Sequence, residues 1–449
     1  MNRVVLFFSL FLYMAITGGL TKAKTPDDLS KSLFHFNNPN KVIEYTGLIY
    51  FNNEYHLFYT EELSEKGDKA CVMSHAVSSD MMKWETQKLD DSPFSVSGKI
   101  TWGVFNDLAG KIGKEQESYL LNIHNNEIGL KRLVGNKWEQ TDIKFNIPDT
   151  DLANIQYPHL KWSNKVSKWV LLLTDTKQSK LEVFVSKDLN EWKHEFTLTG
   201  SSCRPEFISR VSETDEEILF VRDRYSNIDL SKAIDEKNIE YKRLDYGGGY
   251  TQTLCLNKDG KTIICGGIHS DNYKGSDSSI RLTSAKEIKL VSDKLVFTPF
   301  LDGISEGKAL EKKDKKLIPG LGKNLLGGKF GSAYILEGEL EYDNVSSYGF
   351  VFKVGSKHEG YELRYYKKQN IYQCTGGEMA VKPKKESSHV MAVIDNGFLD
   401  FYYDHGTKVM SIALEYMNKA SKLILFNQGG ELYVKTISVT PLLIKEKKK

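Results

Sequence analysis

Cysteine and proline are both scarce in this chain, and long helical patterns are absent. Only five cysteines and 10 prolines occur among 449 residues. The cysteines form no CxxC pair and no His/Cys cluster with zinc spacing, so we expect no bound metal and no cofactor. No long stretch repeats apolar residues with the 3.6-residue period of a helix, which excludes a coiled coil.

Two of the cysteines flank a turn signal, which bears on whether they can pair with each other. Cys255 and Cys265 lie on either side of Asp259-Gly260. If these two residues form the turn of a hairpin, Cys255 lies opposite Ile264 and not opposite Cys265. We therefore predict that the chain has no disulfide framework.

An excess of charge of either sign is also lacking. The chain has 61 basic and 59 acidic residues. Loss of residues 1–23 would remove Arg3 and Lys22 but no acid, which would balance the two signs. We therefore expect no nucleic-acid partner and no anionic membrane as partner. The basic tail, residues 442–449, is most simply a solvated segment.

The N-terminal residues have the pattern of a processing segment. Arg3 precedes an apolar run from Val4 to Ile16, and small residues follow at Thr21 and Ala23. The run is too short to span a bilayer comfortably, so a signal peptide over residues 1–23 is favoured over a membrane anchor. We expect a secreted or extracytoplasmic protein without a membrane span.

Aromatic residues, in contrast, are plentiful, with 23 Tyr, 22 Phe and 6 Trp. Aromatic residues are enriched in strands. Short apolar-aromatic runs separated by Asn, Asp or Gly recur along the chain, for example Gly47–Phe51, Tyr55–Tyr59, Trp169–Leu173 and Leu181–Val185. This pattern predicts an all-β protein with short strands.

A V-S-x-D-x-x-x-W pattern occurs twice, at Val77–Trp84 and at Val185–Trp192. The Asp-x-x-x-Trp part suits a tight turn whose Trp covers the edge of a small sheet, and a pair of short strands precedes each copy. If one period holds two sheets of about 50 residues, residues 26–300 hold about five. This spacing predicts a five-bladed β-propeller.

The composition changes after residue 300. Lys308–Lys316 is rich in charge, and several glycines follow between Pro319 and Gly331. We expect a linker over residues 301–331. Short strand-like runs resume over residues 332–441, which predicts a β-sandwich.

Several longer stretches resemble the motifs of one known family. Phe34–Phe51 resembles the opening of the family's sequences, and His75–Glu85 resembles its motif "HAxSxDLxxWE". Arg243–Tyr250 resembles "LDYGxxFYA", and Leu282–Pro299 resembles "LPRELSLKDGKLxQxP". In the C-terminal part, Val393–Gly406 resembles "VDRSSVEVFVNDG". The family is glycoside hydrolase family 32, which includes invertases, inulinases and levanases. The resemblance implies a five-bladed β-propeller followed by a C-terminal β-sandwich.

The chemistry of that family needs a carboxylate nucleophile, a carboxylic acid/base and a third carboxylate that holds the sugar. In a retaining mechanism the first two groups lie about 5–5.5 Å apart. The nucleophile motif "NDPNG" falls on Ile43–Gly47, so Glu44 replaces the nucleophilic Asp. The "RDP" motif falls on Gln156–Pro158 and the "EC" motif on Ser202-Cys203. The chain therefore departs from the family pattern at all three positions.

Each departure weakens the expected reaction. Glu44 keeps a carboxylate that is one methylene longer, and a misplacement of about 1 Å can cost about 10²-fold in rate. Tyr157, at the stabilising position, can donate a hydrogen bond but carries no charge at neutral pH. Ser202, at the acid/base position, has no acidic proton to give. Glu206 is a possible substitute acid, although pairing with Arg204 is its simpler role.

Other positions that would contact sugar in the family are also altered or only partly kept. By resemblance and by residue type, the candidate substrate-binding residues are Thr60, Ser97, Gly98, Trp102, Arg204 and Tyr246. Most aromatic residues of a propeller pack inside its sheets, so each aromatic candidate has a structural alternative.

The sequence therefore predicts a secreted fructosidase-like protein that has lost most hydrolytic activity and binds a carbohydrate in the propeller funnel. The carbohydrate would be a fructan, sucrose or another glycan. One alternative is an active glycoside hydrolase with rearranged carboxylates, Glu44 and Glu206. A second alternative is a non-enzymatic interaction propeller, which would use its rim.

Overall fold

The computed structural model describes residues 36, 38, 41–65, 68–90, 92–95, 99–114, 117–148, 150–211, 214–269, 280–323, 333–354, 359–383, 386–395, 397–414 and 423–444. The expected signal peptide, Ser97, Gly98 and most of the basic tail lie outside these residues. No helix within the described part is long and apolar enough to cross a membrane.

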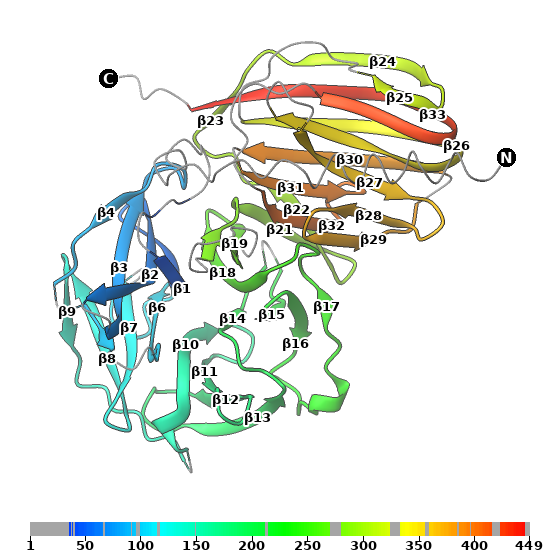
Figure 1. The fold of residues 1–449 in the computed structure, drawn as a ribbon. Helices are drawn as coiled ribbons and strands as arrows, with labels where there is room; N and C mark the ends of the chain where they lie inside the picture. The colour runs from blue at the N-terminus through cyan, green and yellow to red at the C-terminus, as the bar shows by residue number, and fades with distance from the viewer. Residues whose placement is uncertain are drawn as a thin grey trace.

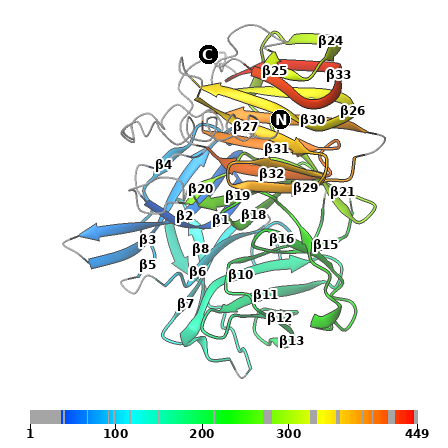
Figure 2. The same ribbon diagram turned by 45° about the vertical axis from the view of Figure 1, so that its right-hand side comes forward.

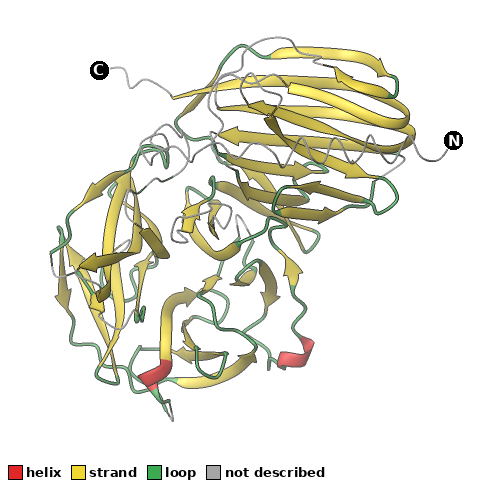
Figure 3. Cartoon of the chain, in the orientation of Figure 1, coloured by secondary structure: helices red, strands yellow, loops and turns green. Residues whose placement is uncertain are grey.

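The described residues form an almost entirely β structure with two bodies, a propeller and a sandwich-like sheet (Figures 1 and 3). Five small antiparallel sheets follow one another around the propeller. The five-bladed propeller predicted from the sequence is therefore confirmed. The two 3-10 helices, η2 (Leu152–Asn154) and η3 (Glu236–Asn238), are single turns between strands.

The five sheets, or blades, are consecutive in the chain. Blade 1 contains β1 (Lys41–Phe51), β2 (Glu54–Glu65), β3 (Asp68–Ser78), β4 (Glu85–Gln87) and β5 (Phe94–Ser95). Blade 2 contains β6 (Trp102–Asp107), β7 (Glu117–His124), β8 (Glu127–Val134) and β9 (Lys137–Gln140). Blade 3 contains β10 (Ile155–Ser163), β11 (Lys168–Asp175), β12 (Lys180–Ser186) and β13 (Lys193–Thr199).

The remaining blades complete the ring. Blade 4 contains β14 (Pro205–Ile208), β15 (Glu217–Val221), β16 (Arg224–Ile228) and β17 (Lys242–Arg243). Blade 5 contains β18 (Tyr250–Lys258), β19 (Lys261–His269), β20 (Ile280–Leu282), β21 (Lys286–Val291) and β22 (Lys294–Pro299). In blade 5, Cys255 pairs with Ile264 across the β18–β19 hairpin, as predicted, and all five cysteines are free thiols.

The repeated sequence motif forms the same turn in blades 1 and 3. Asp80 Oδ1 accepts the backbone N–H groups of the residues two and three positions later, and Asp188 does the same. The indole N–H of Trp84 donates to the carbonyl of Met81, and that of Trp192 donates to Leu189. The predicted Asp-x-x-x-Trp turn is therefore confirmed.

The ring closes through a side chain and not through a shared strand. Gln252 on β18 of blade 5 accepts a hydrogen bond from the backbone N–H of Tyr45 on β1 (3.3 Å) and donates one to the Tyr45 carbonyl (2.8 Å). The Tyr45 hydroxyl donates to the carbonyl of Ile280 (3.1 Å). Gln252 and Tyr45 are both buried, so these bonds satisfy backbone groups that water cannot reach.

Two long strands organise the second body. β26 (Ala333–Val354) pairs with β33 (Leu423–Ile444) along almost its whole length. On its other side, β26 pairs first with β30 (Ser387–Asp395) and then with β27 (Glu359–Tyr366). The pairing of β26 with β33 is irregular near the end of the first part, between Glu339 and Leu340, and again between the two parts, between Val345 and Ser347. Both long strands therefore bend and belong to both layers.

The other strands extend the two layers, and a hydrophobic core fills the space between them. One layer continues from β27 to β28 (Ile371–Cys374) and β29 (Gly377–Ala380), and the other from β30 to β31 (Phe398–Tyr403) and β32 (Lys408–Ala413). This arrangement matches the predicted sandwich.

The segment expected to be a linker, residues 301–331, contributes strands instead. β23 (Ile304–Glu306), β24 (Leu310–Leu317) and β25 (Gly320–Lys323) all pair with β33. The charge-rich stretch falls on β24, whose middle residues are exposed. Lysines suit an edge strand because they discourage pairing with another chain, so this stretch carries strand structure despite its composition.

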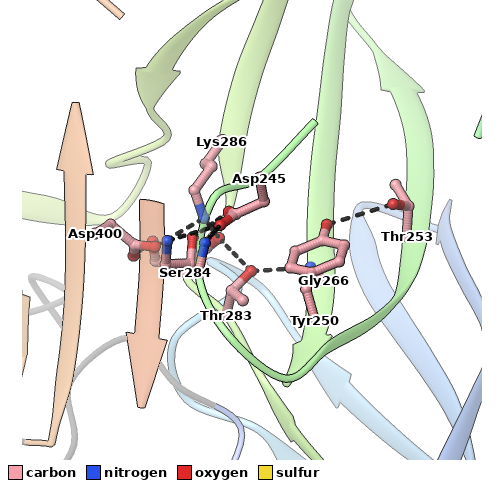
Figure 4. A network of polar contacts seen from close by, with 10 residues as sticks. Asp245, Tyr250, Thr253, Gly266, Thr283, Ser284, Lys286 and Asp400 are labelled. Carbon is pink, nitrogen blue, oxygen red and sulfur yellow. Dashed lines mark hydrogen bonds and ion pairs between the residues drawn. The ribbon is translucent and has the colours of Figure 1, made fainter. Parts of the chain in front are cut away.

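The sandwich lies against the propeller (Figure 2), and an apolar cluster contains residues of both bodies. Buried polar groups also join the two bodies (Figure 4). Lys286 on β21 forms an ion pair with Asp400 on β31 (2.9 Å), and Asp400 also accepts a hydrogen bond from Ser284. Asp245 accepts two hydrogen bonds from Ser411 on β32, from the backbone N–H (2.8 Å) and from the hydroxyl (2.6 Å). These contacts hold the sandwich against blade 5.

We predict that Gln252→Met lowers the free energy of unfolding by about 2–4 kcal/mol, because it leaves the buried N–H and carbonyl of Tyr45 without partners. Urea denaturation followed by circular dichroism measures this change. Gln178→Met, at an exposed turn, is the matched control. Equal stability of the two variants would show that the Gln252 bonds do not close the ring.

Candidate functional site

The candidate site lies where the first strands of different blades meet around the propeller. Glu44 comes from β1, Tyr157 and His159 from β10, and Glu206 from β14, with Arg204 just before β14. The Glu44 carboxyl, the Cys203 thiol and the Arg204 guanidinium all influence the pKa of Tyr157. The structure therefore brings Glu44, Tyr157, Cys203 and Arg204 close together.

Glu44 is a buried carboxyl group, with 9% of its surface exposed. Its Oε1 atom has no hydrogen-bond partner. Burial raises the pKa of Glu44 to about 8, although the nearby Arg204 acts in the opposite direction. The carboxyl group is therefore mainly protonated at neutral pH.

Tyr157 has an unusual backbone conformation. Its φ angle is +53°, which is uncommon for an aromatic residue. The register of β10 against β11 is irregular between Gln156 and His159, and the Tyr157 N–H donates to the carbonyl of Ile100 in the connection before β6 (3.0 Å). Burial raises the pKa of the Tyr157 phenol further above its usual range, so the group is neutral.

Arg204 is the most deeply buried charged group of the cluster, with 2% of its surface exposed. None of its three guanidinium nitrogens has a hydrogen-bond partner. A Cβ atom on Gly103 would lie 4.0 Å from Arg204 Nη1 and 2.1 Å from the carbonyl oxygen of Pro158. Only glycine therefore fits where β6 and β10 meet, and the Arg204 side chain ends beside that meeting point.

Glu206 lies among cationic and neutral nitrogen groups. Its carboxylate is 3.4 Å from His159 Nε2, 3.9 Å from Arg204 Nη2 and 4.0 Å from Lys161 Nζ. Burial raises the pKa of Glu206 to about 7, against the effect of Lys161 and Arg204. Burial also keeps the pKa of His159 well below its usual value, so the imidazole is neutral.

Ser202 and Cys203 lie in the loop before β14. Ser202 is exposed, and Cys203 is partly buried. Burial raises the pKa of the Cys203 thiol, so it is not an activated nucleophile. Ser202, which the resemblance aligns with the family's acid/base, therefore has a solvated hydroxyl group.

The other candidate residues have different surroundings. The indole N–H of Trp102 donates to the Thr60 hydroxyl (3.3 Å), and both side chains are buried. Each side chain therefore satisfies a buried polar group of the other. Tyr246 was expected to bind substrate, but the structure places it at the contact between the two bodies. Its N–H donates to the carbonyl of Val409, and Lys408 lies over its ring. The glycines that follow Tyr246 allow this close approach to the sandwich.

The sequence analysis missed His159 and Lys161 as neighbours of Glu206. They are two residues apart on β10, and side chains with that spacing point to the same face of a strand. The spacing of His159 and Lys161 was visible in the sequence. Their contact with Glu206 could not be predicted, because Glu206 lies on another blade. Among the described residues, no group of three His, Cys, Asp or Glu side chains could hold a metal ion.

Comparisons with known proteins agree with this architecture. The family model for the N-terminal domain of glycosyl hydrolases family 32 matches residues 35–299. A levanase of Bacillus subtilis is 21% identical over 98% of this chain and 74% of that protein. An extracellular exo-inulinase of Aspergillus awamori is 23% identical over 41% of this chain and 40% of that protein.

Solved structures share the fold at low sequence identity. A fructofuranosidase of Schwanniomyces occidentalis complexed with fructosylnystose superimposes with a TM-score of 0.74 at 12% identity, over 94% of this chain and all of that chain. Fructan 1-exohydrolase IIa of Cichorium intybus gives a TM-score of 0.71 at 12% identity, over 95% and 99% of the two chains. Because the family model covers more than half of the sequence, the chain belongs to glycosyl hydrolase family 32.

Proposed function

We propose that the chain is an exported family 32 protein that binds a carbohydrate in its propeller and has lost most hydrolytic activity. The observation that carries this proposal is the substitution of all three residues that the resemblance places at the catalytic positions, with a buried Glu44 at the nucleophile position. A retaining glycosidase needs an ionised nucleophile beside a protonated acid. The pKa of Glu44, about 8, leaves this carboxyl group mainly protonated at neutral pH.

The other two catalytic positions support the same proposal. Tyr157 cannot supply the negative charge of the family's third carboxylate, and the hydroxyl of Ser202 cannot act as a general acid near neutral pH. The substitutions therefore leave a longer, buried carboxyl group at the nucleophile position and no carboxyl group at the other two positions.

Binding of a carbohydrate is supported by the polar groups that the site leaves without partners. Glu44 Oε1 and the Arg204 nitrogens are buried donors and acceptors, and hydroxyl groups of a ligand would satisfy them. The names of the relatives point to fructans, since they include a levanase and an exo-inulinase. Export is supported by the predicted signal peptide and by the extracellular exo-inulinase among the relatives.

An active hydrolase is the second candidate, in which Glu206 supplies the acid. The observation in its favour is that the pKa of Glu206, about 7, suits a general acid near neutral pH. Its nucleophile, however, would still be Glu44, whose raised pKa opposes ionisation.

We predict that the mature protein binds inulin or levan without releasing reducing sugar. Calorimetry measures the binding, and a reducing-sugar assay with sucrose, inulin and levan measures turnover. Turnover that Glu44→Ala abolishes would overturn the proposal in favour of the hydrolase. Absence of both signals for these and other glycans would favour a protein-interaction propeller.

We predict that stability falls as the pH rises from about 4.5 to about 8. In this range Glu44 and Glu206 ionise in the unfolded chain but keep their protons longer in the folded one, since burial raises both pKa values. Each group contributes a slope of at most about 1.4 kcal/mol per pH unit. Urea denaturation between pH 5 and 8 measures the slope.

Glu44→Gln removes one of the two titrating groups, so its stability should depend less steeply on pH than that of the wild-type protein. Glu127→Gln, at an exposed position on β8, is the matched control and should keep the wild-type slope. An unchanged slope in Glu44→Gln would show that Glu44 is ionised in the folded protein.

A further inference from the structure

The contact between the propeller and the sandwich contains buried ionic groups from both bodies (Figure 4). Lys286 on β21 forms an ion pair with Asp400 on β31 and also donates to the carbonyl of Ser284 (3.1 Å). Asp245, in the segment between β17 and β18, has only 2% of its surface exposed. In this contact, one buried cation therefore serves two buried carboxyl groups, one from each body.

In the described part of the chain, no cation forms an ion pair with the Asp245 carboxyl group. Lys286 acts on Asp245 electrostatically, but its close contact is with Asp400 (2.9 Å). The groups that donate directly to Asp245 are neutral, namely the backbone N–H groups of Gly247 (2.7 Å) and Ser411 (2.8 Å) and the Ser411 hydroxyl (2.6 Å). A buried carboxylate without an ion pair is costly, so the charged form of Asp245 weakens the contact between the two bodies.

The two oxygen atoms of Asp245 have partners of different kinds. Oδ1 accepts both backbone N–H groups, which can only donate, whereas Oδ2 accepts from the Ser411 hydroxyl. A hydroxyl group can also accept a hydrogen bond. A proton on Oδ2 can therefore be donated to Ser411 Oγ, and none of the three hydrogen bonds is lost. The same geometry thus accommodates both the charged and the protonated form of Asp245.

Other titratable groups lie on the strands packed around Asp245. They are Tyr250 on β18, Tyr402 on β31, Lys408 on β32 and, on the segment of Asp245 itself, Arg243. Burial raises the pKa of both tyrosines well above the usual value, so they stay neutral. Lys408 lies over the ring of Tyr246, and Arg243 donates to the backbone carbonyl of Asp245 (2.9 Å) and not to its carboxyl group. The ion pair with Lys286 favours the charged form of Asp400.

We propose that Asp245 makes the contact between the propeller and the sandwich pH-dependent, so that weak acid tightens it. The closed contact binds up to one more proton than the open one, because water solvates the Asp245 carboxylate when the contact opens. This inference goes beyond the proposed function and requires no ligand. Burial raises the pKa of Asp245 from 3.8 to about 6 in the closed contact. The stabilisation is therefore complete below about pH 4 and is lost as the pH rises through about 6.

Hydrogen exchange followed by mass spectrometry tests this dependence on the full chain. Two peptides, residues 244–250 and 409–413, contain the amides of Gly247 and Ser411 that donate to Asp245. After correction for the intrinsic effect of pH on exchange, we expect about 10-fold greater protection at pH 5 than at pH 7, because the pKa of Asp245 is about 6 in the closed contact. Peptides of β7 and β8 in blade 2 are the internal reference. No change, or an equal change in the reference peptides, would overturn the inference.

A variant then assigns the effect to Asp245. Asp245→Asn keeps an acceptor oxygen but cannot titrate, so the protection of both peptides should be the same at pH 5 and at pH 7. Asp142→Asn, at an exposed position, is the matched control and should keep the 10-fold response. A folded Asp245→Asn protein with the full response would contradict the inference. If this variant does not fold, the wild-type series against the blade 2 reference still decides.

Discussion

The arrangement of the site depends on how the propeller closes. Blades 1 and 5 share no strand and meet through a common apolar cluster and through the side chain of Gln252, which bonds both backbone groups of Tyr45. Tyr45 directly follows Glu44 on β1, so the same bonds that close the ring also fix the backbone at the nucleophile position. The geometry of the site is therefore a property of the whole ring and not of one blade.

Burial sets the electrostatics at this meeting point. Both carboxyl groups, Glu44 and Glu206, have raised pKa values because desolvation outweighs the attraction of Arg204. In a family 32 enzyme, the reaction needs negative charge at the same place. The chain keeps the propeller of the family, and under the proposed function the substitutions at residues 157 and 202 remove carboxyl groups that the reaction uses.

Local patterns were the features that the sequence could predict. The Asp80 and Asp188 turns and the pairing of Cys255 with Ile264 each depend on residues within one hairpin or one turn, where spacing fixes geometry. The prediction of a linker was wrong because the charged residues of β24 lie on an exposed edge strand, and their presence does not indicate a lack of structure. The sequence did not reveal that Tyr246 contacts the sandwich, because those contacts join residues far apart in the chain.

Contacts between residues far apart in the chain could not be predicted, because no local spacing determines them. The bond between Tyr45 and Gln252 joins residues 207 positions apart, and the contacts of Glu206 with the neutral His159 and with Lys161 join two blades. No periodicity in the sequence marks such pairs. The motif resemblance identified Glu44, Tyr157 and Ser202, but only the structure shows that Arg204 lies in the same cluster without hydrogen bonds.

The two long strands of the sandwich have a consequence for how the chain folds. Each blade is built mainly from hairpins between neighbouring strands, so blades can form soon after synthesis. β26, in contrast, finds its full-length partner only in β33, which follows after β27–β32. Until β33 is synthesised, one edge of β26 has no partner strand. Unpaired strand edges are prone to aggregation. The sandwich therefore depends on pairing between strands far apart in the chain, a feature that in general slows folding.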